Sequence, residues 1–107
     1  MIRMELTEIQ ESPGTFEYSA LDGQERLGCC RFSLPLQELL FLSCQDSQVL
    51  DGLIRATAFY MMQKGIRGIS VEKISDRRGL VSLGFLSDCT ENILNPLSFS
   101  PRCKDCK

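Results

Sequence analysis

The sequence predicts an α+β fold in which antiparallel strands precede a strand–helix–strand unit. Residues 1–43 contain short strand-like runs separated by turn signals. Residues 47–64 place apolar side chains at the i, i+3, i+4 spacing of one helical face. Residues 66–72 return to a strand-like pattern, so the helix should be a right-handed crossover between two parallel strands. Together these observations predict a mixed sheet with a second, shorter helix.

Strands are expected before the helix at residues 2–9, 15–21, 26–34 and 38–43. In the first of them, alternation places the following side chains toward the core: Ile2, Met4, Leu6 and, out of phase, Ile9. Asp22-Gly23 is the strongest hairpin signal in the chain. The apolar run 38–43 suits a buried central strand.

The helix over residues 47–64 organises the chain. Asp46 or Ser47 can cap its start, because either side chain accepts a hydrogen bond from a free backbone N–H group of the first turn. Gly65 ends it, since glycine readily adopts the left-handed conformation found after helices.

After the strand 66–72, a second helix is expected to begin at Ser75-Asp76 and to stop at Gly84. A further strand should open at Phe85-Leu86. Residues 92–100 carry apolar anchors, and Pro96 would confine a strand there to a sheet edge.

A chain of 107 residues with 43% hydrophobic residues is expected to form a single domain, here residues 1–101, followed by a polar cysteine-containing tail, 102–107. The net charge of −2 argues against a nucleic-acid partner. The only adjacent basic pair is Arg77-Arg78, which a solvated helix start explains.

No apolar run is long enough to cross a membrane, and the polar N-terminus does not resemble a signal peptide. We therefore expect a cytoplasmic protein without a membrane partner, whose six cysteines are reduced thiols. The absence of histidine excludes Ser-His and Cys-His catalytic pairs and all His-containing metal sites.

The order of elements from Glu38 to Phe85 resembles the GNAT superfamily of N-acetyltransferases. In that family, a loop of pattern Gln/Arg-x-x-Gly-x-Gly/Ala and the following helix N-terminus hold the pyrophosphate of acetyl-CoA. On this sequence the loop corresponds to residues 45–50, after the strand end at Cys44. The resemblance thus implies cofactor contacts from Cys44, Gln45, Asp46, Ser47, Gln48, Val49 and Leu50.

The sequence departs from the family pattern in this loop. Gln45 matches its first position, but Gln48 and Leu50 replace both glycines, so side chains crowd the approach of a phosphate. Asp46 adds a negative charge and competes for the N–H groups that a phosphate would use.

A second family motif, Asn-x-x-Ala-x-x-x-Tyr-x-x-x-Gly-Phe, is retained only at Leu83-Gly84-Phe85. Leu80 occupies the position of the tyrosine that serves the family as general acid, and leucine cannot donate a proton. Tyr60 lies in the long helix and is expected to pack in the core.

A general base for acetyl transfer could be Glu38 or Glu72, which begin and end predicted strands. Either glutamate could equally be a solvated strand terminus. Cys44 could face a ligand at the strand end, or it could be a buried apolar residue.

Cys103-x-x-Cys106 has the spacing of two zinc ligands. The remaining ligands would have to come from Cys89, Cys44 or the Cys29-Cys30 pair, and no second Cys-x-x-Cys exists. Zinc is therefore not expected, and the alternative is a tail with exposed thiols.

Three functional hypotheses follow. The first is an acyl-CoA-dependent N-acyltransferase domain, weakened or inactive, that would use acetyl-CoA or another acyl-CoA and a small amine or a protein amine. The second is a non-catalytic binding or assembly module on the same scaffold, and a third is a cysteine-dependent metal-binding module. The edge strand around residues 94–99 could also pair with a second copy as a homodimer, although Pro96 and Pro101 oppose this.

Overall fold

A computed structural model describes residues 2–94, and it confirms the predicted α+β class. The predicted edge strand beyond Leu94 and the tail with Cys103 and Cys106 lie outside the described residues. The elements, in chain order, are β1 (Ile2–Glu8), β2 (Thr15–Asp22), β3 (Glu25–Ser33), β4 (Glu38–Cys44), α1 (Ser47–Gln63), β5 (Ile69–Ser70), α2 (Arg78–Ser82) and β6 (Ile93–Leu94). No helix among them is long and apolar enough to span a membrane.

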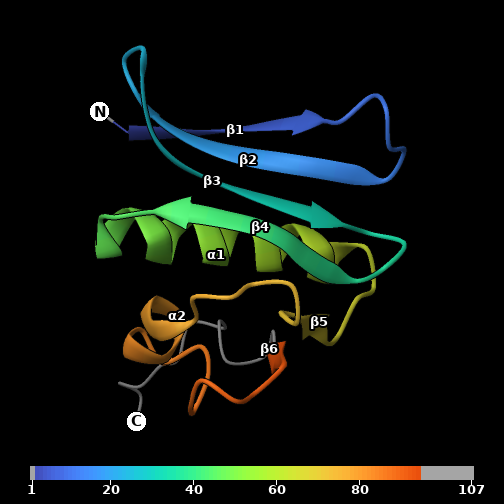
Figure 1. Ribbon diagram of the computed structural model, residues 1–107. Helices are drawn as coiled ribbons and strands as arrows, with labels where there is room; N and C mark the ends of the chain where they lie inside the picture. The colour runs from blue at the N-terminus through green and yellow to red at the C-terminus, as the bar shows by residue number, and fades with distance from the viewer. Residues whose placement is uncertain (1, 95–107) are drawn as a thin grey trace, which may run out of the picture.

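The strands form one six-stranded mixed sheet with the order β1-β2-β3-β4-β5-β6 (Figure 1). β1 to β4 make a continuous antiparallel meander. The turn at Gly23, whose φ is +65°, joins β2 to β3 as the Asp22-Gly23 signal predicts. β5 runs parallel to β4 but pairs with it only through Glu38 and Ser70. The sheet is therefore extensively paired on its N-terminal side and sparsely paired on the other.

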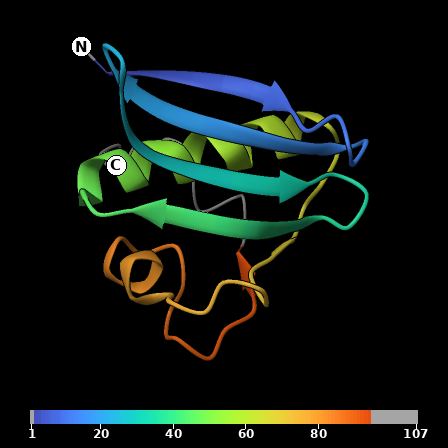
Figure 2. The same ribbon diagram turned by 45° about the horizontal axis from the view of Figure 1, so that its top comes forward.

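α1 packs against one face of this meander, whereas the other face looks toward the viewer in Figure 2. The buried side of the helix carries Val49, Leu50, Leu53, Ile54, Thr57, Ala58 and Met61. Tyr60 joins the aromatic cluster beneath the sheet, with its ring centroid 5.5 Å from Phe16 and 5.9 Å from Phe32. Its predicted packing role is confirmed.

Both ends of α1 follow the sequence signals. Asp46 is the N-cap residue, and its carboxylate accepts hydrogen bonds from backbone N–H groups of the first turn. Gly65, at φ +87°, follows the helix in the left-handed conformation, as predicted.

The predicted inward side of β1 is only partly buried. Met4 is half-buried against α1, but Ile2 and Leu6 are 47% and 37% exposed. β1 is an edge strand, and α1 lies mainly over β2, β3 and β4. The helix therefore does not cover all the apolar side chains on the inward face of β1.

The predicted strands after α1 are shorter than expected or absent. In the range 66–72 only Ile69–Ser70 is a strand, although Ile66 and Val71 are also buried. Phe85 and Leu86 are not a strand: their N–H groups donate to the Leu80 carbonyl at 2.8 and 3.3 Å and so close the C-terminus of α2. In both segments apolar side chains are buried, although much of the backbone is irregular. Their sequence pattern therefore resembled that of a strand.

The second helix is also shorter than predicted. α2 begins at Arg78 with Arg77 as its N-cap residue, not at Ser75-Asp76. Asp76 nevertheless contacts the start of α2, because its Oδ1 accepts a hydrogen bond from the Arg78 N–H at 3.2 Å. Gly84, at φ +90°, follows the helix end as expected.

Candidate functional site

A cleft of about 540 Å³ opens where β4 extends beyond its one pairing with the short strand β5. It lies between the C-terminal half of β4, the first turn of α1 and α2, which sits beside the end of β4 in both ribbon views (Figures 1 and 2). Its lining residues are Leu42, Ser43, Cys44, Leu50, Asp76, Arg78, Gly79, Leu80 and Ser82.

The edge of β4 that faces this cleft has no strand partner beyond Glu38 among the described residues. A strand edge presents alternating N–H and C=O groups, which are strong hydrogen-bonding groups. The cleft is therefore bordered by a backbone edge that can pair with another extended chain.

The inner wall of the cleft is apolar and closely packed. Leu80 is fully buried, and Leu50 is only 8% exposed. A Cβ atom on Gly79 would lie 2.6 Å from Leu50 Cδ2, so α2 approaches the start of α1 as closely as a residue without a side chain allows. This contact fixes the position of α2 at the back of the cleft.

Cys44 contributes a neutral thiol to the cleft. Its Sγ donates a weak hydrogen bond to the Asp46 carbonyl at 3.4 Å. Burial raises the pKa of the Cys44 thiol above its ordinary value, and the Asp46 backbone offsets this only in part. A thiol with a raised pKa is a poor nucleophile at neutral pH, so Cys44 acts here as a wall residue.

The rim of the cleft carries one ion pair. Arg78 Nε and Nη2 donate to Asp76 Oδ1 and Oδ2, each at 3.0 Å, and these hydrogen bonds lower the pKa of Asp76 to about 2. The Asp76 and Arg78 charges cancel, so the lining as a whole carries no net charge at neutral pH.

The bend that the GNAT resemblance assigns to pyrophosphate does not form a phosphate cradle. Asp46 Oδ1 accepts from the N–H groups of Gln48 and Val49 at 2.8 and 3.2 Å, so two helix N-terminal donors are already bound. Gln45, Asp46, Ser47 and Gln48 are exposed and do not line the cleft, whereas Val49 is buried in the core. Of the predicted cofactor contacts, only Cys44 and Leu50 lie in the cleft. These residues therefore do not fit a diphosphate.

The two candidate general bases lie away from the cleft. Glu38 is at the opposite end of β4 from Cys44, about 20 Å away at the usual rise per strand residue. It is 8% exposed, and its Oε2 accepts from Lys73 Nζ at 2.5 Å. Glu72 is exposed just after β5, and its N–H donates to Ser70 Oγ at 3.3 Å. Neither carboxylate lines the cleft.

Some residues of this region had no signal in the sequence. Arg77 stands at a helix start, as expected, but it is not simply solvated: its guanidinium joins two separate backbone segments, residues 72–74 and 89–92. It donates to the carbonyl oxygens of Glu72, Ile74, Cys89 and Glu91 and to Asn92 Oδ1. Ser43 and Ser82 of the cleft likewise belong to no motif.

Comparisons with known proteins leave the resemblance untested. No protein-family model matches this sequence, and no curated protein shows a significant match. Within residues 2–94, no group of three or more metal-ligating side chains is arranged to hold an ion. The predicted zinc ligands Cys103 and Cys106 lie outside that range.

Proposed function

We propose that this chain is a non-catalytic binding module on a GNAT-like scaffold, and that its cleft binds an extended, amide-bearing chain along β4. The observation that carries the proposal is that, within residues 2–94, the outer edge of β4 has no strand partner after the Glu38–Ser70 pair, beside a cleft of about 540 Å³. This volume lies within the roughly 300–1,000 Å³ of ligand sites.

The character of the cleft supports an uncharged, extended ligand. An unpaired strand edge binds amide groups through main-chain hydrogen bonds, while side-chain pockets add selectivity. Here Leu42, Leu50 and Leu80 supply apolar wall, and Ser43 and Ser82 supply hydroxyl groups. A peptide segment and a pantetheine arm share this amide chemistry, so both are sources to be tested.

The side chains around the cleft favour binding over catalysis. Leu80 cannot donate a proton, Glu38 is held by Lys73 far from the cleft, and Cys44 is held in its neutral form. An acyl-CoA-dependent transferase is the second candidate, and the early end of the parallel pairing between β4 and β5 favours it. It would require a diphosphate to bind where Asp46 already occupies the N–H groups.

Two-dimensional NMR titration tests the proposal with two probes, acetyl-pantetheine and a capped valine-alanine pentapeptide. We expect at least one probe to shift the amide resonances of residues 40–44 and 78–82. We also expect acetyl-CoA to bind no more tightly than acetyl-pantetheine, because Asp46 gives its diphosphate no site.

A matched pair of variants links binding to the cleft. Ser82 lines the cleft and Ser87 lies outside it, and both are exposed. Ser82→Trp should block the probe, and Ser87→Trp should not. The proposal is wrong if neither probe shifts residues 40–44. Binding of acetyl-CoA more than about tenfold tighter than acetyl-pantetheine would instead favour the transferase.

A further inference from the structure

The face of the meander opposite α1 carries a second ordered group of side chains. Residues directly opposite one another in a sheet point to the same face. The strand register therefore places Glu17, Arg31 and Phe41 in one row across β2, β3 and β4. Ser19, Cys29 and Ser43 form the neighbouring row. These two neighbouring rows therefore form one surface on the face of the sheet opposite α1.

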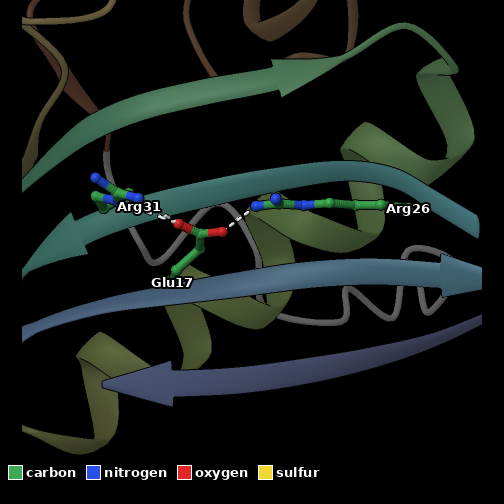
Figure 3. A network of polar contacts seen from close by, with 3 residues as sticks. All are labelled: Glu17, Arg26 and Arg31. Carbon is green, nitrogen blue, oxygen red and sulfur yellow. Dashed lines mark hydrogen bonds and ion pairs between the residues drawn. The ribbon is translucent and has the colours of Figure 1, made fainter. Parts of the chain in front are cut away.

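Glu17 holds two arginines in place on this face (Figure 3). Its Oε1 accepts from Arg31 Nε and Nη2 at 3.1 and 2.8 Å, and its Oε2 accepts from Arg26 Nη2. The Glu17 side chain is only 12% exposed, whereas those of Arg26 and Arg31 are 51% and 45% exposed. The carboxylate thus lies below two guanidinium groups that remain accessible.

A recess of about 370 Å³ opens beside this network. Its lining residues are Glu17, Arg26, Leu27, Gly28, Cys29, Arg31, Phe41 and Ser43. Cys29 is 7% exposed, and burial raises the pKa of its thiol despite the nearby arginines, so it is neutral at pH 7. Two guanidinium groups and one carboxylate leave the recess with a net charge of +1, in a chain whose net charge is −2.

We infer that this recess is a second binding site, separate from the cleft although Ser43 borders both, for a small organic carboxylate with a planar apolar body. Each guanidinium has five N–H donors, and Glu17 uses only one of Arg26 and two of Arg31. The remaining donors match a carboxylate, which arginine binds with fixed geometry. Because Glu17 already orders both arginines, less side-chain entropy is lost on binding.

Phe41 provides the contact for the apolar body of the ligand. Its side chain lies opposite Arg31 in the register and is 51% exposed. An exposed aromatic ring beside guanidinium donors favours a ligand that combines a planar apolar group with one negative charge. The net charge of +1 matches a monoanion.

Benzoate is the probe for this site, with benzamide as its neutral counterpart of the same shape. In an NMR titration, we expect benzoate to shift the amides of Cys29, Arg31 and Phe41, but not that of Leu80 in the cleft. A ligand of this size should bind with a Kd on the order of 1 mM. Benzamide should bind at least about tenfold more weakly, because it carries no charge.

Arg26→Gln and Arg3→Gln are a matched pair of variants. Arg26 and Arg3 both lie opposite Leu21, so each variant removes one positive charge from the same row, but only Arg26 lines the recess. Arg26→Gln leaves the Arg31–Glu17 pair intact and should weaken benzoate binding about tenfold. Arg3→Gln should change it less than about twofold, because exposed charges at that distance are screened.

Phe41→Ala tests the apolar contact and should weaken benzoate binding several-fold without unfolding the protein, because this side chain is half exposed. The inference is overturned by any of three results. These are the absence of saturable shifts at about 20 mM benzoate, equal binding of benzamide, and equal loss of binding in the Arg3 and Arg26 variants.

Discussion

Gly79 lies against Leu50 so closely that a Cβ atom on Gly79 would be 2.6 Å from Leu50 Cδ2. This contact joins the start of α2 to the first turn of α1 and forms the back of the cleft. Glycine in a helix normally costs about 1 kcal/mol relative to alanine. In this position the small size of the residue offsets that cost, because a larger residue would force the buried Leu50 side chain to move.

Gly79→Ala is therefore expected to destabilise the protein, although alanine is the better helix former. Overpacking a buried contact costs about 1–3 kcal/mol, which exceeds the gain of about 1 kcal/mol in helix propensity. We expect a net loss of about 1 kcal/mol in urea unfolding. In a Leu50→Ala background the same change should instead stabilise the protein, and destabilisation there would contradict the contact.

Arg77→Met should lower the free energy of unfolding by about 2–3 kcal/mol, because it removes charged donors from several carbonyl groups at once. The neighbouring Arg78 is the matched control, since its side chain bonds, within the described part of the chain, only to exposed Asp76. Arg78→Met should leave the unfolding midpoint nearly unchanged. Equal effects of the two variants would show that Arg77 does not join these segments.

Thr57→Val is expected to stabilise the protein by up to about 1 kcal/mol. Thr57 is 1% exposed, and its Oγ1 has no hydrogen-bond partner among the described residues. The Thr57 hydroxyl faces the Cys30 sulfur, which is too weak an acceptor to satisfy it. Valine has nearly the same shape and no polar atom to leave unpaired.

Thr15→Val is the control for this prediction. Thr15 is also buried, at 5% exposure, but its Oγ1 lies 2.9 Å from Ser12 Oγ in a hydrogen bond. This variant should therefore cost about 1 kcal/mol in thermal or urea unfolding. If both valine variants destabilise the protein equally, the Thr57 hydroxyl has a partner after all.

The stability of the protein should fall as the pH rises above 9. Burial raises the pKa of Cys30 from 9.0 to about 12. Between these values the unfolded thiol loses its proton and the folded one keeps it, so alkaline pH favours unfolding by about 1.4 kcal/mol per pH unit. The shift adds nothing below pH 9, where both states hold the proton.

Cys30→Ala should remove the contribution of this one proton to the pH dependence. Burial also raises the pKa values of Tyr18, Cys29 and Cys44, so part of the alkaline destabilisation should remain. The measurement is urea unfolding at several pH values from 8 to 11. An unchanged slope in Cys30→Ala would show that Cys30 is not the titrating group.

The sequence alone was sufficient to predict the helix ends and the turn that local chemistry determines. Asp46 and Gly65 mark the two ends of the long helix, because helix capping and left-handed backbone have strong residue preferences. The turn at Gly23 follows for the same reason. The strands that were predicted wrongly lie after residue 65, where Phe85 and Leu86 are buried at the C-terminus of α2 and do not pair in a sheet. An apolar pattern indicates that side chains are buried, but it does not indicate whether their backbone is a strand or the end of a helix.

The two hollows could be anticipated only in part. The bend after β4 pointed to the cleft, but the walls from α2 depend on the Gly79–Leu50 contact, which no local pattern encodes. The recess on the outer face depends on register across β2, β3 and β4. Register brings together Glu17, Arg31 and Phe41, which are far apart in the chain and form no motif.

The single residue pair between β4 and β5 divides the molecule into two parts that need not open together. The meander and α1 share long ladders and an aromatic core, whereas β5, α2 and β6 have only short ladders and join the rest mainly through side-chain packing. Native-state hydrogen exchange should therefore resolve two cooperative units, with amides of residues 69–94 exchanging through a smaller opening free energy. The cleft lies at the boundary of these units, so a ligand bound there would slow exchange in the second unit and make both unfold as one.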